Sequence, residues 1–287
     1  MDTPISPSNE TVWVNGSLLH EGDVQISPFD HGLLTGDGVF ETMVAHGKIP
    51  FAFTRHYRRL ERSAACFGLS IPDAETLHRA CRDVAGANGL DSARIRVTVT
   101  GGRAPLGSEK GNSTETVIVA SGELPHQPEV TQVVTVPYAR NEHGALVGLK
   151  TTSYGENVVA LAYAKENGAR EAIFGNVNGD LCEGTGSNIF IVKNGELITP
   201  PLTAGCLPGV TRALVVDLCL AANVKLQQID TPLNGLTEVD SAFLTSTLRG
   251  VQPIASVNGE QLKEVGGEAL DKIQAAFGEL CKNHPDP

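Results

Sequence analysis

A lone lysine and an acidic, glycine-rich turn are the residues of this chain with the clearest chemical potential. Lys150 ends the apolar run 145–149, just before an expected helix. Apolar surroundings penalise the ammonium form, and a neutral amine can attack an aldehyde. Glu183 opens the turn E-G-T-G-S-N-I-F, which lacks the G-x-G-x-x-G spacing of a nucleotide-binding loop. Taken alone, Lys150 could be a solvated lysine and Glu183 an exposed turn residue.

Two further segments could bind an anion. Gly209, Val210 and Thr211 begin an expected helix, where free N–H groups and a hydroxyl can hold a phosphate. The segment T-S-T-L-R-G at 245–250 adds hydroxyls, including that of Thr247, and Arg249 could meet a substrate carboxylate. An ordinary helix start and a common strand end explain each segment equally well by itself. Together, the amine, the carboxylate, the phosphate cradle and the hydroxyls are what pyridoxal 5'-phosphate (PLP) requires.

The elements that must position these residues form two α/β domains. We expect a small domain at 1–121, a linker with two prolines at 122–130, and a larger domain at 131–287 whose sheet is broken by hairpins. Thr54 is expected to cap the first long helix, and Asn-Gly pairs mark the hairpins. The expected strands are 11–14, 38–45, 94–100, 116–120, 130–136, 240–245 and 251–257, and the expected helices are 54–67, 72–89, 155–167, 209–223 and 268–282.

Composition excludes several function classes. The chain has 287 residues, 41% of them apolar, and a net charge of -11, which argues against nucleic-acid binding. No apolar run is long enough for a membrane span and no signal peptide is visible, so we expect a cytoplasmic protein. The six cysteines include no C-x-x-C pair and have no histidine at zinc-ligand spacing, so we expect unreactive thiols and no metal.

The quoted segments resemble the class IV aminotransferases, the fold-type IV PLP enzymes. The resemblance rests on E-G-T-G-S-N-I-F, on L-I-T at 197–199, on L-P-G-V-T-R at 207–212 and on D-H-G…G-D-G-V-F-E-T at 30–42. It extends from about Val12 to Pro253. It implies an active site between the two domains of a homodimer.

The resemblance also implies roles for single residues. Lys150 would form the Schiff base with PLP and move the proton at the substrate Cα, and Glu183 would keep the pyridine nitrogen protonated. Tyr154 would lie beside the cofactor's O3′. The phosphate would be held by Arg55, Val210, Thr211 and Thr247.

The family contains several reactions, and the sequence leaves three functions open. One is an aminotransferase acting between an amino acid, possibly of D configuration, or a primary amine and a 2-oxo acid. The second is a 4-amino-4-deoxychorismate lyase, in which Thr42 would be the proton donor and Arg96 and Arg103 would meet the charged substrate. Phe40, Arg96, Arg103 and Arg249 are the candidate substrate-binding residues, and branched-chain enzymes match least well at Gly36–Thr42. The third, a non-catalytic PLP-binding protein, is disfavoured because Lys150 and Glu183 are both present.

Overall fold

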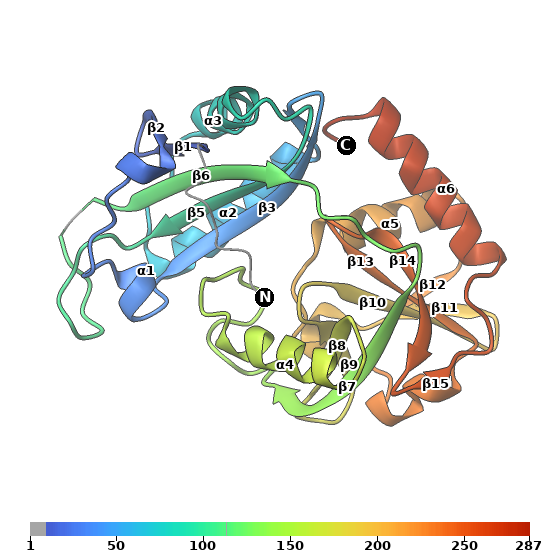
Figure 1. The fold of residues 1–287 in the computed structure, drawn as a ribbon. Helices are drawn as coiled ribbons and strands as arrows, with labels where there is room; N and C mark the ends of the chain where they lie inside the picture. Colours follow the sequence, from blue (N-terminus) through green and yellow to red (C-terminus); the bar gives the residue numbers. More distant parts are fainter. Residues whose placement is uncertain (1–9, 113) are drawn as a thin grey trace. The chain divides into compact units, whose positions relative to one another are not determined.

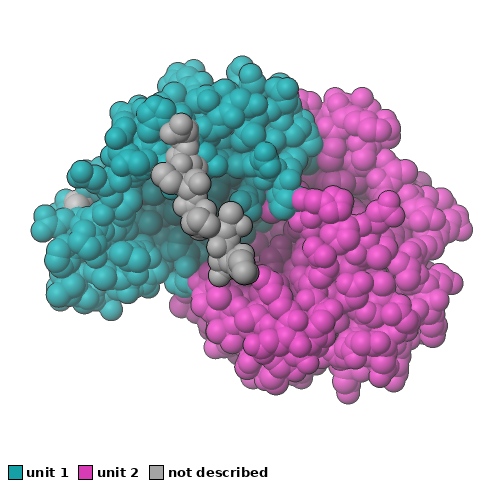
Figure 2. All heavy atoms as spheres, in the orientation of Figure 1, with its two compact units in different colours: residues 1–125, 149–153, 286 teal, residues 126–148, 154–285, 287 magenta. Residues whose placement is uncertain are grey.

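The chain folds into two units, which Figure 2 draws in different colours. The computed structural model describes residues 10–112 and 114–287. The first unit contains the described residues up to Pro125 together with Leu149–Ser153 and Asp286, and the second contains the remainder. Lys150 therefore belongs to the first unit, although its position in the sequence placed it in the domain 131–287. The last strand of the first unit ends at Glu123, inside the segment expected to be a linker.

The first unit is built on a six-stranded antiparallel sheet (Figure 1). Asn15 and Gly16, both with positive φ, form the predicted hairpin between its first two strands. The strand order is β2-β1-β6-β5-β3-β4. The strands are β1 (Thr11–Val14), β2 (Ser17–His20), β3 (Gly38–His46), β4 (Ile49–Pro50), β5 (Ser92–Thr100) and β6 (Thr116–Glu123), and the helices are α1 (His31–Leu34), α2 (Phe53–Phe67) and α3 (Ala74–Ala87).

One face of this sheet packs against α2 and α3. Side chains alternate along a strand, so Val39, Met43 and Ile95 join Leu60 and Leu77 of the helices in one apolar core. The residues between them, such as Phe40, Thr42 and Arg96, therefore point to the opposite face. This alternation decides which predicted site residues can meet.

The ends of these helices confirm one prediction, the end of α2 after Phe67, and correct another. Gly68 ends α2 in the left-handed conformation, and Asp73 caps α3 by accepting from the Thr76 N–H. The prediction that Thr54 caps α2 is wrong. The helix begins one residue earlier because the turn after β4 brings Ala52 into a left-handed conformation and buries Phe53, so Thr54 lies inside the first turn.

The second unit contains a nine-stranded mixed sheet interrupted by hairpins, as predicted. Asn194-Gly195 and Asn258-Gly259 form two of the turns with positive φ at both residues. The order is β12-β11-β10-β13-β14-β7-β8-β9, with β15 paired to β14. The strands are β7 (Thr131–Arg140), β8 (Glu171–Asn176), β9 (Leu181–Gly184), β10 (Asn188–Lys193), β11 (Glu196–Thr199), β12 (Leu226–Gln228), β13 (Ser241–Ser246), β14 (Gly250–Val257) and β15 (Glu260–Gln261).

Three helices cover this sheet. The helix α4 (Gly155–Glu166) packs on Phe174 and its neighbours, and α5 (Val210–Ala221) and α6 (Glu268–Asn283) pack on the stacked rings of Phe190 and Phe243. Within the described ranges, no helix has the length and apolar character needed to cross a membrane. The six cysteines are free thiols.

Candidate active site

Lys150 is held in the first unit by backbone pairing of its segment with β3, where Thr151 and Val39 form an isolated antiparallel bridge. The Phe40 N–H donates to the Lys150 carbonyl at 3.0 Å, and the Thr152 N–H donates to the Gly38 carbonyl at 2.9 Å. From the other side, the Lys150 N–H donates to Ser63 Oγ of α2 at 3.2 Å. This antiparallel register places Lys150 opposite Phe40, so both side chains lie on the same face of the sheet.

Phe40 is the centre of that face. The Lys150 Nζ lies 4.2 Å from the centroid of the Phe40 ring, and the Arg96 Cζ lies 3.7 Å from the same centroid. Thr42 is paired directly with Arg96 across β3 and β5. Four residues predicted separately from the sequence are thus neighbours: an amine, an aromatic ring, a hydroxyl and a guanidinium.

The G-D-G motif makes room for the Lys150 segment. The Gly36 carbonyl accepts from Thr152 Oγ1 at 3.1 Å and from Ser153 Oγ at 3.3 Å. A Cβ on Gly36 would lie 2.5 Å from Ser153 Oγ, and φ at Gly36 is +70°. A Cβ on Gly38 would lie 2.8 Å from Thr152 Oγ1. Only glycine fits at these positions without displacing the segment that carries the lysine.

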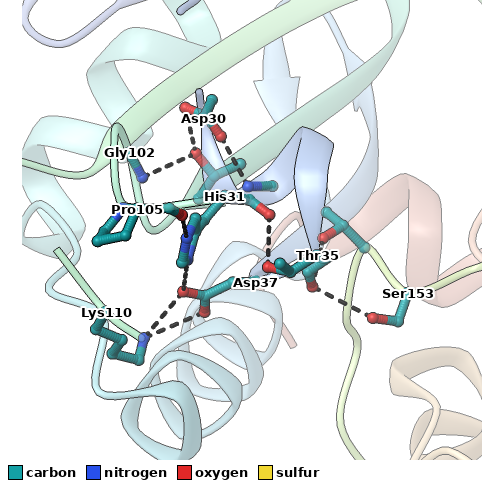
Figure 3. A network of polar contacts seen from close by, with 12 residues as sticks. Asp30, His31, Thr35, Asp37, Gly102, Pro105, Lys110 and Ser153 are labelled. Carbon is teal, nitrogen blue, oxygen red and sulfur yellow. Dashed lines mark hydrogen bonds and ion pairs between the residues drawn. The ribbon is translucent and has the colours of Figure 1, made fainter. Parts of the chain in front are cut away.

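The aspartate of this motif anchors the loop between β5 and β6 (Figure 3). Asp37 contacts His31 Nδ1 at 3.5 Å and Lys110 Nζ at 3.1 Å, and His31 Nε2 donates to the Pro105 carbonyl at 2.7 Å. Arg103 lies on this loop with its Cζ 5.6 Å from the Phe29 ring centroid. The Arg103 guanidinium thus lies near the Phe29 ring, whereas that of Arg96 lies over the Phe40 ring.

Behind β3, a buried acid has three close contacts from α2. Glu41 accepts from Arg59 Nε at 2.7 Å and Nη2 at 2.8 Å, and lies 2.7 Å from His56 Nδ1. Burial alone would raise the pKa of Glu41, but the charge of Arg59 and the contact with His56 lower it well below its usual range. Burial lowers the pKa of His56, and the Glu41 carboxylate offsets part of that effect. Arg55, the predicted phosphate ligand, is half-buried one turn before Arg59.

Glu183 lies on β9 in the second unit. Its Oε2 accepts from the Leu207 N–H at 2.8 Å, and its Oε1 lies 3.4 Å from Arg140 Nε. The thiols of Cys182 and Cys206 are close enough to influence each other, but burial raises the pKa of Cys206 to about 12 and that of Cys182 further. Burial therefore disfavours the thiolate form of both cysteines, and Glu183 is the carboxylate next to them.

The start of α5 meets the requirements of a phosphate site. Its N-cap residue Gly209 offers no side-chain acceptor, so the N–H groups of the first turn point outward uncapped. A Cβ on Gly209 would lie 2.0 Å from Asn188 Oδ1, which explains the glycine. Thr211 is buried in the first turn. Thr247 lies in the β13–β14 turn. Two residues earlier, the buried Thr245 hydroxyl has no hydrogen-bond partner among the described residues.

Arg249, another candidate for the substrate carboxylate, has several protein partners. Its guanidinium donates to Gln252 Oε1 at 2.6 Å and to the Arg170 carbonyl at 3.2 Å, and it lies 3.5 Å from Glu171. Glu171 in turn accepts from the N–H and hydroxyl of Thr185 in the E-G-T-G-S turn. Arg249 therefore braces the turn after Glu183. Tyr154 is the N-cap residue of α4 and makes no side-chain cap.

These features fit PLP: an uncapped helix start for its phosphate, a carboxylate for its ring nitrogen and an amine for its aldehyde. Residues 38–257 match the model of the family described as amino-transferase class IV. The chain belongs to that family.

Class IV aminotransferases use PLP, and similar proteins of known structure carry cofactor derivatives. A T.th. branched-chain aminotransferase, in complex with N-(5'-phosphopyridoxyl)-L-glutamate, has a TM-score of 0.87 at 25% identity and covers 96% of this chain and 94% of its own. The Escherichia coli branched-chain enzyme has a TM-score of 0.88 at 29% identity, with 95% and 94% covered. The predicted fold, family and cofactor are thereby confirmed.

The relatives of this chain are named for two different activities. A provisionally named branched-chain-amino-acid aminotransferase of Methanocaldococcus jannaschii is 32% identical over 277 residues, covering 94% of this chain and 96% of that protein. Aminodeoxychorismate lyase of Bacillus subtilis is 28% identical over 288 residues, with 95% of each covered. Branched-chain enzymes are thus prominent among the relatives, although their sequences were expected to match this chain least well at Gly36–Thr42.

Sequence reasoning missed three residues that the fold of the first unit brings together. Glu41, His56 and Arg59 did leave a signal in the sequence. It is an acid within the apolar strand G-V-F-E-T-M-V-A, followed by H-x-x-R on the next helix. Arg140 had no such signal, because its contact with Glu183 depends on the pairing of β7, β8 and β9. Within the described residues, no group of three or more His, Cys, Asp or Glu side chains could hold a metal ion.

Proposed function

We propose that this chain is a PLP-dependent aminotransferase that moves the amino group of an amino acid to a 2-oxo acid. The observation that carries the proposal is the face of the β3–β5 sheet on which Lys150, Phe40, Thr42 and Arg96 meet. An amine for covalent chemistry and a guanidinium for a carboxylate both lie there against one aromatic ring.

Bound PLP supplies an aldehyde for the amino group and a ring that accepts the electrons released at Cα. The protein residues do the rest. Lys150 would hold the aldehyde and carry the proton at Cα, and Glu183 would hold a proton at the ring nitrogen. The first turn of α5 would bind the phosphate through the Val210 N–H and Thr211, with Arg55 and Thr247, and Tyr154 would contact the ring hydroxyl.

The substrate carboxylate is assigned to Arg96. Arg249 is tied to Gln252, Arg170 and Glu171, and Arg103 lies over Phe29 on the loop, so Arg96 is the candidate guanidinium that shares the Phe40 ring with the lysine. The names of several relatives favour branched-chain amino acids as donors. D-Alanine and (R)-1-phenylethylamine remain the alternative donors to be tested.

A specific observation favours a second candidate, the 4-amino-4-deoxychorismate lyase. The Thr42 hydroxyl lies directly across from Arg96 on the same face as Lys150, where it could return a proton as pyruvate leaves. The Bacillus subtilis relative carries that activity in its name. The product distinguishes the two reactions: a lyase releases pyruvate and 4-aminobenzoate, and an aminotransferase converts a 2-oxo acid into an amino acid.

A homodimer is the assembly that we propose. The first unit exposes Leu33 of α1 (71%), two residues after His31, and Leu106 of the loop (74%), next to Pro105, and His31 Nε2 donates to the Pro105 carbonyl. Phe29 is exposed as well, two residues before His31. Apolar surface of this kind is usually covered by a partner. Light scattering on the native protein and on Leu33→Glu would detect the dimer and its loss.

Substitution of the lysine tests the function. Lys150→Ala should abolish transamination and the visible absorbance of covalently bound PLP, whereas Lys165→Ala, on the exposed end of α4, should change neither. The measurement combines an absorbance spectrum after PLP addition with product analysis for L-leucine, D-alanine, (R)-1-phenylethylamine and aminodeoxychorismate. Turnover retained by Lys150→Ala would overturn the proposal.

A further inference from the structure

Arg140 reaches across a strand to the carboxylate of Glu183. It is the last residue of β7, and its guanidinium carbon lies 4.2 Å from the centroid of the Phe174 ring on β8. Phe174 is paired with Glu183 of β9, so both side chains lie on the same face of the sheet. The Arg140 Nε lies 3.4 Å from Glu183 Oε1.

This ion pair supplies charge rather than a strong hydrogen bond. Charge-assisted N–H···O bonds are usually about 2.7–2.9 Å long. The Arg140 Nε is farther away and, though buried, makes no hydrogen bond to a described residue. The Leu207 N–H fixes the other oxygen of Glu183 at 2.8 Å. A carboxylate has about four acceptor positions, so the N–H of a bound ring can be added to these contacts.

Other contacts hold Arg140 in this position. Its Nη1 donates to Glu156 Oε2 at 2.9 Å, and Nη1 and Nη2 each lie 3.4 Å from Asn157 Oδ1. Glu156 is 71% exposed, so its effect on the guanidinium charge is weakened by solvent. Arg140 and Glu183 are only 16% and 12% exposed. The guanidinium charge therefore acts mainly on the buried carboxylate.

A carboxylate and a pyridine nitrogen that share one proton can exist as an ion pair or as a neutral pair. Burial favours the neutral pair, in which the proton lies on the carboxylic acid and the ring becomes a poor electron acceptor. A neighbouring cation favours the carboxylate. We propose that Arg140 is a positioning residue that keeps Glu183 ionised, so that the shared proton stays on the ring nitrogen of the cofactor.

This inference rests on the proposed function, because it requires PLP with its ring nitrogen at Glu183. It involves no oxidation or bond exchange beyond the movement of one proton between an oxygen and a nitrogen. It also predicts what a purely structural role would not: Arg140 should affect the ring nitrogen even when the fold is unchanged.

The experiment places PLP labelled with nitrogen-15 in the native holoenzyme and in the variants. The ring-nitrogen chemical shift of the native protein should be that of a protonated pyridine, and that of Glu183→Gln should be that of an unprotonated one. Arg140→Gln should move the signal toward the unprotonated value, and Arg140→Lys should restore most of the native signal. Glu156→Gln, the matched control at the exposed partner, should leave the signal in place.

Kinetics provide the second readout. Loss of a unit charge about 4 Å from the carboxylate, at an effective dielectric constant of about 20, should lower kcat roughly tenfold or more, with a smaller change in KM. In the Glu183→Gln background the same Arg140→Gln change should have less than about a twofold effect, because contacting residues are non-additive.

A native-like nitrogen signal in Arg140→Gln, or an equal loss of kcat in both backgrounds, would overturn the inference and leave the proposed function intact. Failure of the native protein to bind PLP covalently would instead overturn the proposed function. The melting temperature of the apoprotein should be measured for each variant, so that a folding defect in Arg140→Gln is recognised and Arg140→Lys then decides.

Discussion

Glu41 of the first unit and the partly buried Glu183 of the second are bound in very different ways. Glu41 has contacts of 2.7, 2.7 and 2.8 Å from His56 and Arg59, and it is only 1% exposed. Glu183 accepts from the Leu207 N–H at 2.8 Å, but its arginine lies 3.4 Å away. Arg59 is thus hydrogen-bonded directly to Glu41, whereas Arg140 lies farther from Glu183. The comparison teaches which carboxylate is the better candidate for binding a ligand. It is Glu183, which has no close hydrogen bond to its arginine, rather than the more buried Glu41.

The largest effect should come from Glu183. Glu183→Gln should lower kcat by about 100-fold or more, because the ring loses its ionised partner, as with other electrostatic stabilisers of charge. The thermal stability of the apoprotein should change little. Steady-state kinetics and calorimetry on the same preparation would check both. A variant with near-native kcat would contradict the functional half of the comparison.

Glu41 should behave in the opposite way. Glu41→Gln removes the carboxylate charge that contacts the buried Arg59, and breaking a buried ion pair typically costs about 3–5 kcal/mol of stability. The activity that remains in the folded fraction should be closer to native than that of Glu183→Gln. Urea unfolding gives the free energy. A loss below about 1 kcal/mol would mean that the trio contributes little to stability, and the contrast with Glu183 would be lost.

The pH dependence of the free energy of unfolding should test the Glu41 site further. The pKa values of Glu41 and His56 are both lowered in the folded protein. Their contributions are therefore fully present above the unfolded-state values, roughly 6.5 for His and 4.3 for Glu, and are lost as the pH falls below them. The urea midpoint should fall with acidification from about pH 6.5 and more steeply below about pH 4.3. Glu41→Gln should flatten the steeper part of this dependence.

The smallest effect is expected at Thr42, and it distinguishes the two reactions. Thr42→Val removes a hydroxyl next to Arg96 while keeping the size of the side chain. Transamination should change less than about threefold, because a single neutral hydrogen bond contributes about 1 kcal/mol or less. The release of pyruvate from aminodeoxychorismate should instead be strongly reduced if the protein is a lyase. Product analysis of the two reactions side by side decides between them.

Local signals predicted much of the fold. The end of α2 before Gly68 and the Asn-Gly turns at 15–16, 194–195 and 258–259 each depend on residues close together in the sequence, and the structure contains them. Thr54 failed as a cap because the left-handed Ala52 determines the start of α2. An alanine carries no sequence signal for that conformation.

The contacts of the candidate site also fall into those that local patterns predict and those that they do not. Two-residue periodicity and strand pairing account for the meeting of Phe40, Thr42 and Arg96 on one face. The partners of Arg249 and Arg140 could not be predicted, because they depend on which strands are neighbours in the second sheet. Charged residues distant in sequence meet only through that strand order.

The segment that carries Lys150 and pairs with β3 has a consequence for how the protein is made. Residues 149–153 complete the edge of β3, yet they follow residues 126–148, which belong to the other unit. A ribosome that has released only the first 125 residues has therefore produced a sheet whose β3 edge, from Gly38 to Phe40, still offers unpaired backbone groups. Such edges pair readily with other chains. The nascent protein is thus exposed to mispairing until the lysine itself has been synthesised and has emerged.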